Sequence, residues 1–150
     1  MMSLPSLLAG QDRISSTPQN LIELIEFLAS ESVTIDCEAP FQVVTVNGTT
    51  IISPNYPYDY EGNKDCQVTI RFAYNQVGAI MFEAFDVKRD TTCSFDYLAV
   101  HDGNDTDSPM IGPKLCGTSP AGTTLKSTGN VMTLHFHTDR TVTRSGFKID

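Results

Sequence analysis

After residue 36 the sequence is built from short segments in which apolar and polar residues alternate, with turn-forming residues between them. A period of two is typical of a β-strand that buries one face, and this part of the chain has no helical spacing of apolar residues. We expect strands at residues 66–72, 77–85, 123–127 and 131–137, with a last strand beginning at Gly146. Short strands at this spacing predict an all-β fold in which two sheets pack as a sandwich or one sheet closes as a barrel.

Two further segments flank the dipeptide Asn47-Gly48, which favours the tight turn of a β-hairpin. Residues 42–46 are rich in valine, and residues 49–52 resume a β-branched pattern. We therefore predict a short hairpin across this turn. A long turn rich in proline and tyrosine follows at residues 53–63, and residues 110–115 are typical of a short edge segment interrupted by a proline.

Residues 1–36 form an N-terminal segment with a different pattern. Thr17 and Pro18 are suited to cap and begin a helix, and the apolar residues that follow recur at helical spacing. We predict an amphipathic helix over about residues 18–30. This helix is either a linker that packs on the following domain or a helix that binds a partner or another copy of the chain. The segment lacks the basic start and long apolar stretch of a signal peptide.

Composition and charge exclude several classes of function. The net charge of −8 argues against nonspecific binding to nucleic acid and against a polybasic site for membrane surfaces. No apolar run approaches the roughly 18 residues of a membrane span. Four evenly spread cysteines without a Cys-x-x-Cys pair predict two disulfides in an oxidising compartment, with three possible connectivities. Asn47 and Asn104 each begin a glycosylation triplet, which is compatible with secretion.

The segment from Phe85 to Gly103 poses the main chemical question. Its alternation places Asp96 on the same strand face as Leu98 and Val100, which are apolar. A buried carboxylate must be paired, hydrogen-bonded or bound to a metal. The candidates that neutralise Asp96 are therefore a divalent cation, a lysine or a network of hydrogen bonds.

Several motifs occur in one order along the chain. They are Cys37, Ser-Pro-Asn-Tyr-Pro at 53–57, Cys66, Phe85-Asp-Val, Cys93 to Val100, Leu115-Cys-Gly, and Ser145-Gly-Phe. In these motifs residues 37–150 resemble a CUB domain, an extracellular module with a two-sheet antiparallel jelly-roll β-sandwich. The resemblance implies the disulfides Cys37–Cys66 and Cys93–Cys116. It also implies that the chain is part of a longer secreted or cell-surface protein, because the sequence stops early in the last strand.

The resemblance also implies the place of a calcium site, but one position departs from it. Calcium-binding CUB domains use a glutamate five residues before the third cysteine, an aspartate three after it and an aspartate in the last loop. Here these positions are Lys88, Asp96 and Asp139. Calcium needs about six to eight oxygen ligands, so losing one carboxylate to an ammonium weakens the site. No cofactor is favoured, although calcium stays an alternative.

We expect the Lys88 ammonium to take roughly the place of the ion and to bridge Asp96 and Asp139. One alternative is that Lys88 reaches into solvent while Asp96 is held by backbone donors or by Tyr60. The other is that calcium is retained.

The sequence has none of the nucleophile, zinc-protease or phosphate-loop motifs of common enzymes, so we expect no catalytic activity. His135 and His137 lie two apart on one strand face and could seat a metal, but two ordinary polar positions are favoured. The function expected is a non-catalytic, extracellular recognition module. One alternative is a non-catalytic domain of a secreted complement- or astacin-type protease. The other is a matrix or adhesion protein that self-associates through its N-terminal helix.

The resemblance implies that partners meet the loops at the calcium end of the sandwich, often through a lysine inserted into the calcium cluster. With Lys88 already there, that mode would be blocked. We instead expect the basic residues Lys88, Arg89, Arg140 and Arg144 to gather at the same loop end, where they would suit an acidic or sulfated partner. The exposed sheet is the other candidate surface.

Overall fold

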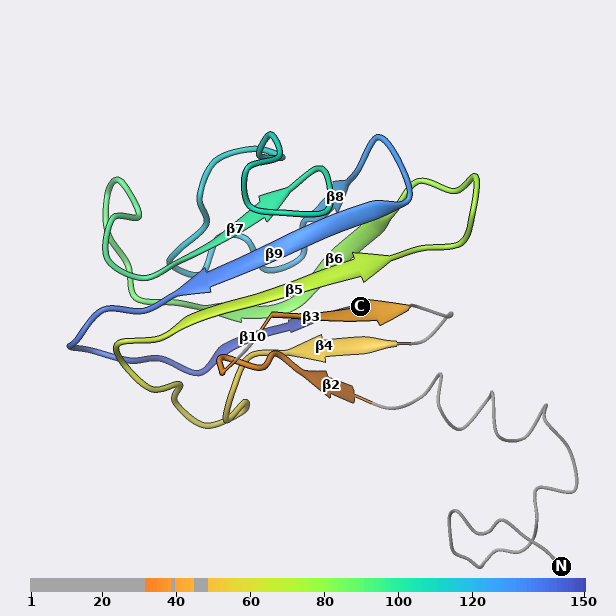
Figure 1. The fold of residues 1–150 in the computed structure, drawn as a ribbon. Helices are drawn as coiled ribbons and strands as arrows, with labels where there is room; N and C mark the ends of the chain where they lie inside the picture. Colours follow the sequence, from red (N-terminus) through yellow and green to blue (C-terminus); the bar gives the residue numbers. More distant parts are fainter. Residues whose placement is uncertain (1–31, 39, 45–48) are drawn as a thin grey trace, which may run out of the picture. The chain divides into compact units, whose positions relative to one another are not determined.

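Two β-sheets form the fold of this protein in the computed structural model, which describes residues 32–38, 40–44 and 49–150 (Figure 1). The first sheet has the strand order β2-β4-β10-β6-β8. Its strands are β2 (Ser32–Thr34), β4 (Thr50–Ile52), β10 (Gly146–Ile149), β6 (Ala79–Asp86) and β8 (Thr124–Lys126). The expectation of an all-β, two-sheet sandwich is therefore confirmed.

The second sheet has the strand order β3-β5-β9-β7. Its strands are β3 (Phe41–Val44), β5 (Asp65–Arg71), β9 (Val131–His137) and β7 (Tyr97–His101). Strand pairs are antiparallel except β2 with β4 and β3 with β5. All these strands belong to one compact unit, and the predicted helix at residues 18–30 lies outside the described residues.

The predicted hairpin across Asn47-Gly48 is wrong. Strand β3 pairs in parallel with β5, whereas β4 pairs with β2 and β10, so the two segments lie in different sheets. A hairpin would place both segments side by side in one sheet. Crossing between sheets instead lets each segment reach the core, where Ile51 is buried and Val43 packs partly buried.

Two other segments differ from the sequence-based expectations. Strand β2 precedes Cys37, and the buried Ile35 that follows it is part of the core, so this sheet begins within the segment that we assigned to the N-terminal appendage. Between Met110 and Leu115 the chain forms only isolated bridges, His101 to Met110 and Leu98 to Leu115. The proline in this segment cannot donate a ladder hydrogen bond, which is consistent with a discontinuous edge.

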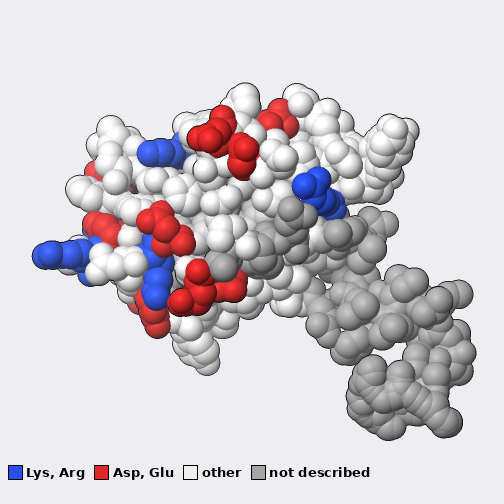
Figure 2. Space-filling model, in the orientation of Figure 1, with Lys and Arg blue, Asp and Glu red and all other residues white. Residues whose placement is uncertain are grey.

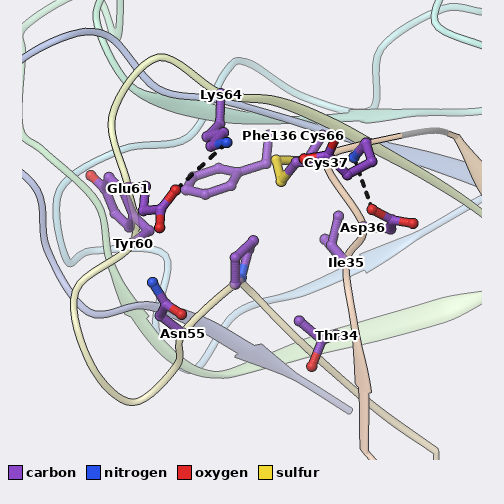
Figure 3. A pocket seen from close by; sticks show the side chains of 12 residues that line it. Thr34, Ile35, Asp36, Cys37, Asn55, Tyr60, Glu61, Lys64, Cys66 and Phe136 are labelled. Carbon is purple, nitrogen blue, oxygen red and sulfur yellow. Dashed lines mark hydrogen bonds and ion pairs between the residues drawn. A yellow bond between two sulfur atoms is a disulfide. The ribbon is translucent and has the colours of Figure 1, made fainter.

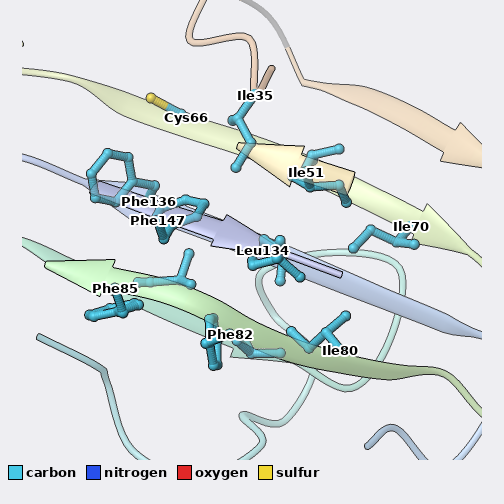
Figure 4. Close-up of a cluster of buried hydrophobic side chains, with 14 of the residues drawn as sticks. Ile35, Ile51, Cys66, Ile70, Ile80, Phe82, Phe85, Leu134, Phe136 and Phe147 are labelled. Carbon is cyan, nitrogen blue, oxygen red and sulfur yellow. The ribbon is translucent and has the colours of Figure 1, made fainter. Parts of the chain in front are cut away.

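The core fills the space between the two sheets (Figure 4). The alternation expected for residues 131–137 is confirmed, because Met132, Leu134 and Phe136 are fully buried. The ring of Phe136 meets that of Phe147, from the other sheet, edge to face at 5.1 Å. Aromatic and branched side chains from both layers therefore interlock, which is the main source of stability in a sandwich of this kind.

The disulfides are Cys37–Cys66 and Cys93–Cys116, as the family resemblance implied. They join residues 29 and 23 apart in the sequence. Loops of this length give a stabilisation of roughly 3 to 4 kcal/mol each by chain entropy. The first ties the segment before β3 to the start of β5, and the second lies near β7. Within the described part of the chain, no helix is both long and apolar enough to cross a bilayer.

Candidate functional site

The carboxylate of Asp96 is fully buried directly before β7, as the alternation of the sequence predicts. Its Oδ2 accepts a hydrogen bond of 2.7 Å from the hydroxyl of Tyr60. Its Oδ1 accepts a hydrogen bond of 2.7 Å from the backbone N–H of Asp139. Burial raises the pKa of Asp96, and these two donors oppose that effect. The charge is thus compensated by a hydrogen-bond network, one of the three candidates.

The phenol of Tyr60 connects this carboxylate to the rest of the site. Tyr60 is 2% exposed, and its ring meets Phe136 edge to face at 5.1 Å. Its hydroxyl donates to Asp96 and accepts a hydrogen bond of 3.0 Å from the backbone N–H of Lys88. Burial, together with the hydrogen bond to Asp96, raises the pKa of Tyr60 well above its usual range, so the phenol is a proton donor at any ordinary pH.

Lys88 lies just beyond the end of β6 and points at the loop that follows β9. Its ammonium donates to both carboxylate oxygens of Asp139, at 3.0 and 2.9 Å. It also donates to the backbone carbonyl of Thr141 at 3.1 Å and to the Thr141 hydroxyl at 3.3 Å. The ring of Phe95 lies 4.7 Å from the ammonium. The hydrogen bond from Lys88 lowers the pKa of Asp139.

The expected bridge by Lys88 therefore holds for Asp139 and not for Asp96. Among the described residues, the structure has no hydrogen bond or ion pair between Lys88 and Asp96. The two Asp96 oxygens instead accept short hydrogen bonds from the Tyr60 hydroxyl and from the backbone N–H of Asp139. A chain of hydrogen bonds connects the site. Tyr60 donates to Asp96, the backbone N–H of Lys88 donates to Tyr60, and the Lys88 side chain donates to Asp139.

Glycine allows the two loops of this site to approach closely. A Cβ atom on Gly62 would lie 2.6 Å from the backbone oxygen of Asp139, closer than real Cβ contacts. That same oxygen accepts a hydrogen bond of 2.8 Å from the N–H of Asn63. The turn at residues 60–64 is thereby fixed against the loop that carries Asp139.

The residues present do not fit a calcium ion. Calcium takes about six to eight oxygen ligands at roughly 2.3–2.6 Å. Both oxygens of Asp139 face an ammonium instead, and both oxygens of Asp96 accept hydrogen bonds from fixed donors. A cation at this place would meet the positive charge of Lys88. Within the described residues there is also no group of three or more His, Cys, Asp or Glu side chains placed to hold a metal.

A hollow of about 480 Å³ lies beside Tyr60 (Figure 3). The rings of Tyr60 and Phe136 and the Cys37–Cys66 disulfide line it, and it has a polar edge. On that edge, Lys64 forms an ion pair with Glu61 at 3.6 Å. Asp96 is not among the residues that line this hollow.

The four cationic residues singled out in the sequence occupy different environments. The Lys88 ammonium contacts the carboxylate of Asp139, and Arg140 follows Asp139 in the sequence. Arg144 lies in the same loop, and its guanidinium donates to the carbonyl of Thr143 at 3.0 Å. Arg89 instead lines a second hollow beside the Cys93–Cys116 disulfide. On the face drawn in Figure 2, the described basic side chains are interspersed with acidic ones.

His135 and His137 are joined by a residue that sequence reasoning missed. His135 Nε2 and His137 Nδ1 lie 2.8 and 3.0 Å from the same oxygen of Asp65. The ring of Tyr97 stacks on His137 at 5.1 Å. Asp65 is directly opposite His137 in the register of β5 and β9, and only knowledge of that register could have identified it. The two histidines therefore lie side by side on β9 against one carboxylate oxygen.

The two glycosylation triplets differ in what the structure shows. Asn104 is exposed in the loop after β7. Asn47 lies outside the described residues.

Comparisons with known proteins agree with this architecture. The model of the CUB domain family matches residues 37–150. Human cubilin is 35% identical over 134 residues, which is 84% of this chain and 4% of cubilin. The bone morphogenetic protein 1 homolog of Strongylocentrotus purpuratus is 40% identical over 101 residues, which is 67% of this chain and 16% of that protein. The chain thus spans a small part of these relatives.

Solved structures show the same fold. The extracellular region of zebrafish Gpr126/Adgrg6 matches 76% of this chain and 14% of that chain, with 30% identity and a TM-score of 0.62. The MASP-1 CUB2 domain bound to Ca²⁺ matches 67% of this chain and 87% of that domain, with 25% identity and a TM-score of 0.58. The sequence match, the disulfides and the sandwich agree, and the chain belongs to the CUB domain family.

Proposed function

We propose that this CUB domain is a non-catalytic, extracellular recognition module whose binding loops are ordered by Lys88 in place of calcium. The observation that carries this proposal is the ammonium of Lys88, held within 3.0 Å of both oxygens of Asp139. The CUB family is a family of non-catalytic modules, and its relatives are extracellular proteins or ectodomains. The two disulfides suit the same compartment.

Lys88 supplies what a bound cation would supply to these loops. The side chains of Lys88 and Asp139 are only 15% and 27% exposed, so their attraction is screened less than that of a surface pair. Through Thr141 and Asp139 the ammonium fixes the loop after β9 to the end of β6. Tyr60 and Asp96 complete the connection to β7. An internal cation of this kind is independent of the calcium concentration outside the cell.

The same geometry bears on how a partner binds. A partner's lysine cannot enter a cluster that already contains the Lys88 ammonium, because two ammonium groups at one carboxylate repel each other. We therefore infer that a protein partner, with acidic or sulfated groups, meets the exposed basic side chains Arg89, Arg140 and Arg144. We also propose that the exposed Asn104 is glycosylated, as is Asn47.

The proposal is tested by titrating the protein with calcium in a calorimeter and by comparing its melting temperature in calcium and in chelator. We expect no binding heat and no change in melting temperature. The variant Lys88→Glu restores a carboxylate and removes the ammonium, so it should bind calcium and melt higher in calcium than in chelator. Calcium binding by the unaltered protein would overturn the proposal.

The other functions left open by the sequence stay proposals. As a second candidate, the module is a non-catalytic domain of a larger secreted protein similar to the bone morphogenetic protein 1 homolog, of which it matches 16%. The full-length sequence would decide this. The third candidate is a matrix or adhesion protein that self-associates through a helix at residues 18–30, which lie outside the residues that the structure describes. Sedimentation of the chain with and without residues 1–36 tests it.

A further inference from the structure

A second hollow, of about 470 Å³, lies between residues 89–93 and 113–120. It is distinct from the Lys88 site: Asp96 and Asp139 do not line it, and in the described part of the chain no hydrogen bond or ion pair joins its lining residues to either aspartate. The Cys93–Cys116 disulfide joins its two sides. Paired hydrogen bonds between the backbones of Val87 and Gly117, at 3.1 and 2.8 Å, hold the sides together further. The hollow is thus formed in advance, which lowers the entropy cost of binding a ligand.

Two cationic side chains line this hollow, Arg89 and Lys114. Both residues are exposed, and in the described part of the chain neither forms an ion pair. The ammonium of Lys114 is positioned 4.1 Å above the ring of Tyr97. A cation over an aromatic face keeps N–H donors free on its other side, and a guanidinium offers a planar fork of donors. The hollow therefore presents two cations without carboxylate partners.

Asp90 is the one acidic residue that lines the hollow, and its carboxylate accepts hydrogen bonds from its own loop. The Oδ2 atom of Asp90 accepts hydrogen bonds from the N–H of Ser94 at 3.1 Å and from the N–H and hydroxyl of Thr92 at 3.2 and 2.9 Å. These bonds, led by that from Ser94, lower the pKa of Asp90. Counting Asp90, Arg89 and Lys114, the lining carries one net positive charge in a protein whose net charge is −8.

Hydroxyl groups add neutral donors beside the two cations. Thr91, Thr118 and Ser119 line the same hollow, and Thr118 and Ser119 are exposed. Cations combined with hydroxyl donors suit an oxyanion, because charged and neutral hydrogen bonds can share its oxygens. Because the protein has a net charge of −8 and only two cations line this hollow, the surface around the hollow would repel an extended polyanion. A single acidic side chain meets the two cations without crossing acidic surface.

We propose that this hollow binds an acidic side chain, aspartate or glutamate, from a loop of a protein partner. Arg89 would face the carboxylate with its donor fork, and Lys114 would add a point charge from the opposite side. The inference rests on the proposed recognition function and specifies the chemical class of its partner. It assigns the contact with one carboxylate to Arg89 and Lys114, and Arg140 and Arg144 stay candidates for the rest of the partner surface.

The test uses the full chain with both disulfides and the peptide acetyl-Gly-Glu-Glu-Gly-amide, followed by shifts of backbone amide signals in NMR. The control peptide carries Gln in place of both Glu residues. We expect millimolar binding, on the order of 4 kcal/mol or weaker, with shifts at residues 89–93 and 113–120. The double variant Arg89→Gln/Lys114→Gln should bind at least tenfold more weakly. The control variant Lys126→Gln removes an exposed cation from strand β8, away from the lining of the hollow, and should bind as the unaltered protein does.

Equal shifts with the Gln peptide would overturn the proposal, and so would unchanged binding by the double variant. A heparin octasaccharide that shifts these amides when the Glu peptide does not would assign the hollow to a sulfated glycan and would also overturn it. Amide shifts confined to residues 138–145 would support a recognition function but would show that the Glu peptide does not bind in this hollow, which overturns the present proposal. An unchanged melting temperature shows that each variant is folded.

Discussion

Replacing Lys88 by methionine tests the central ion pair with little change in side-chain volume. The substitution removes two hydrogen bonds to Asp139 and those to Thr141, and it leaves a partly buried carboxylate without its cation. A hydrogen bond to a charged group contributes about 1.5 to 3 kcal/mol, and partial exposure reduces the value. We expect Lys88→Met to lower the free energy of unfolding by about 2 kcal/mol, measured by urea denaturation.

The matched control is Lys148→Met, which removes another short ion pair of the same sandwich. Lys148 lies 2.7 Å from Glu83, but these side chains are 38% and 43% exposed. Water and salt screen an exposed pair of this kind, so the control should destabilise the protein much less than Lys88→Met does. The slope of the urea transition should stay the same in both variants. Equal losses in the two variants would refute the claim that Lys88 orders the loops from a protected position.

Three further predictions concern neighbouring groups. Tyr60→Phe leaves Asp96 with one donor and should cost about 1 to 3 kcal/mol in urea denaturation; no loss would show that water replaces the phenol. Because Lys88 lowers the pKa of Asp139, the stabilisation is present above the unfolded-state pKa near 4 and is lost as the pH falls through the lowered value. The difference in unfolding free energy between the unaltered protein and Asp139→Asn should therefore be largest near pH 7 and shrink on acidification; a constant difference contradicts this assignment. Phe136→Ala removes a fully buried ring and should cost about 3 to 5 kcal/mol, with a markedly lower urea midpoint; a loss below 1 kcal/mol would contradict the packing.

The chain's local patterns determined which side chains are buried. Alternation along residues 131–137 identified Met132, Leu134 and Phe136 as core residues, and the same period placed Asp96 on a buried face. These features are predictable because a strand's two faces follow from its backbone geometry alone. The cysteine pairing came from the family resemblance, since spacing alone leaves three connectivities.

Only the tertiary structure decided which groups meet. A strong turn signal at Asn47-Gly48 did not make β3 and β4 neighbours, because β4 pairs with β10, almost one hundred residues later, and a turn cannot specify so distant a partner. The sequence predicted that Lys88 lies near both Asp96 and Asp139, but not that it contacts only Asp139 of the two. In the folded protein Lys88 contacts Asp139, whereas the oxygens of Asp96 accept hydrogen bonds from Tyr60 and from a backbone N–H. Which carboxylate a lysine reaches is a property of the packed structure, because the packing of the two sheets sets the distances between loops that are far apart in the sequence.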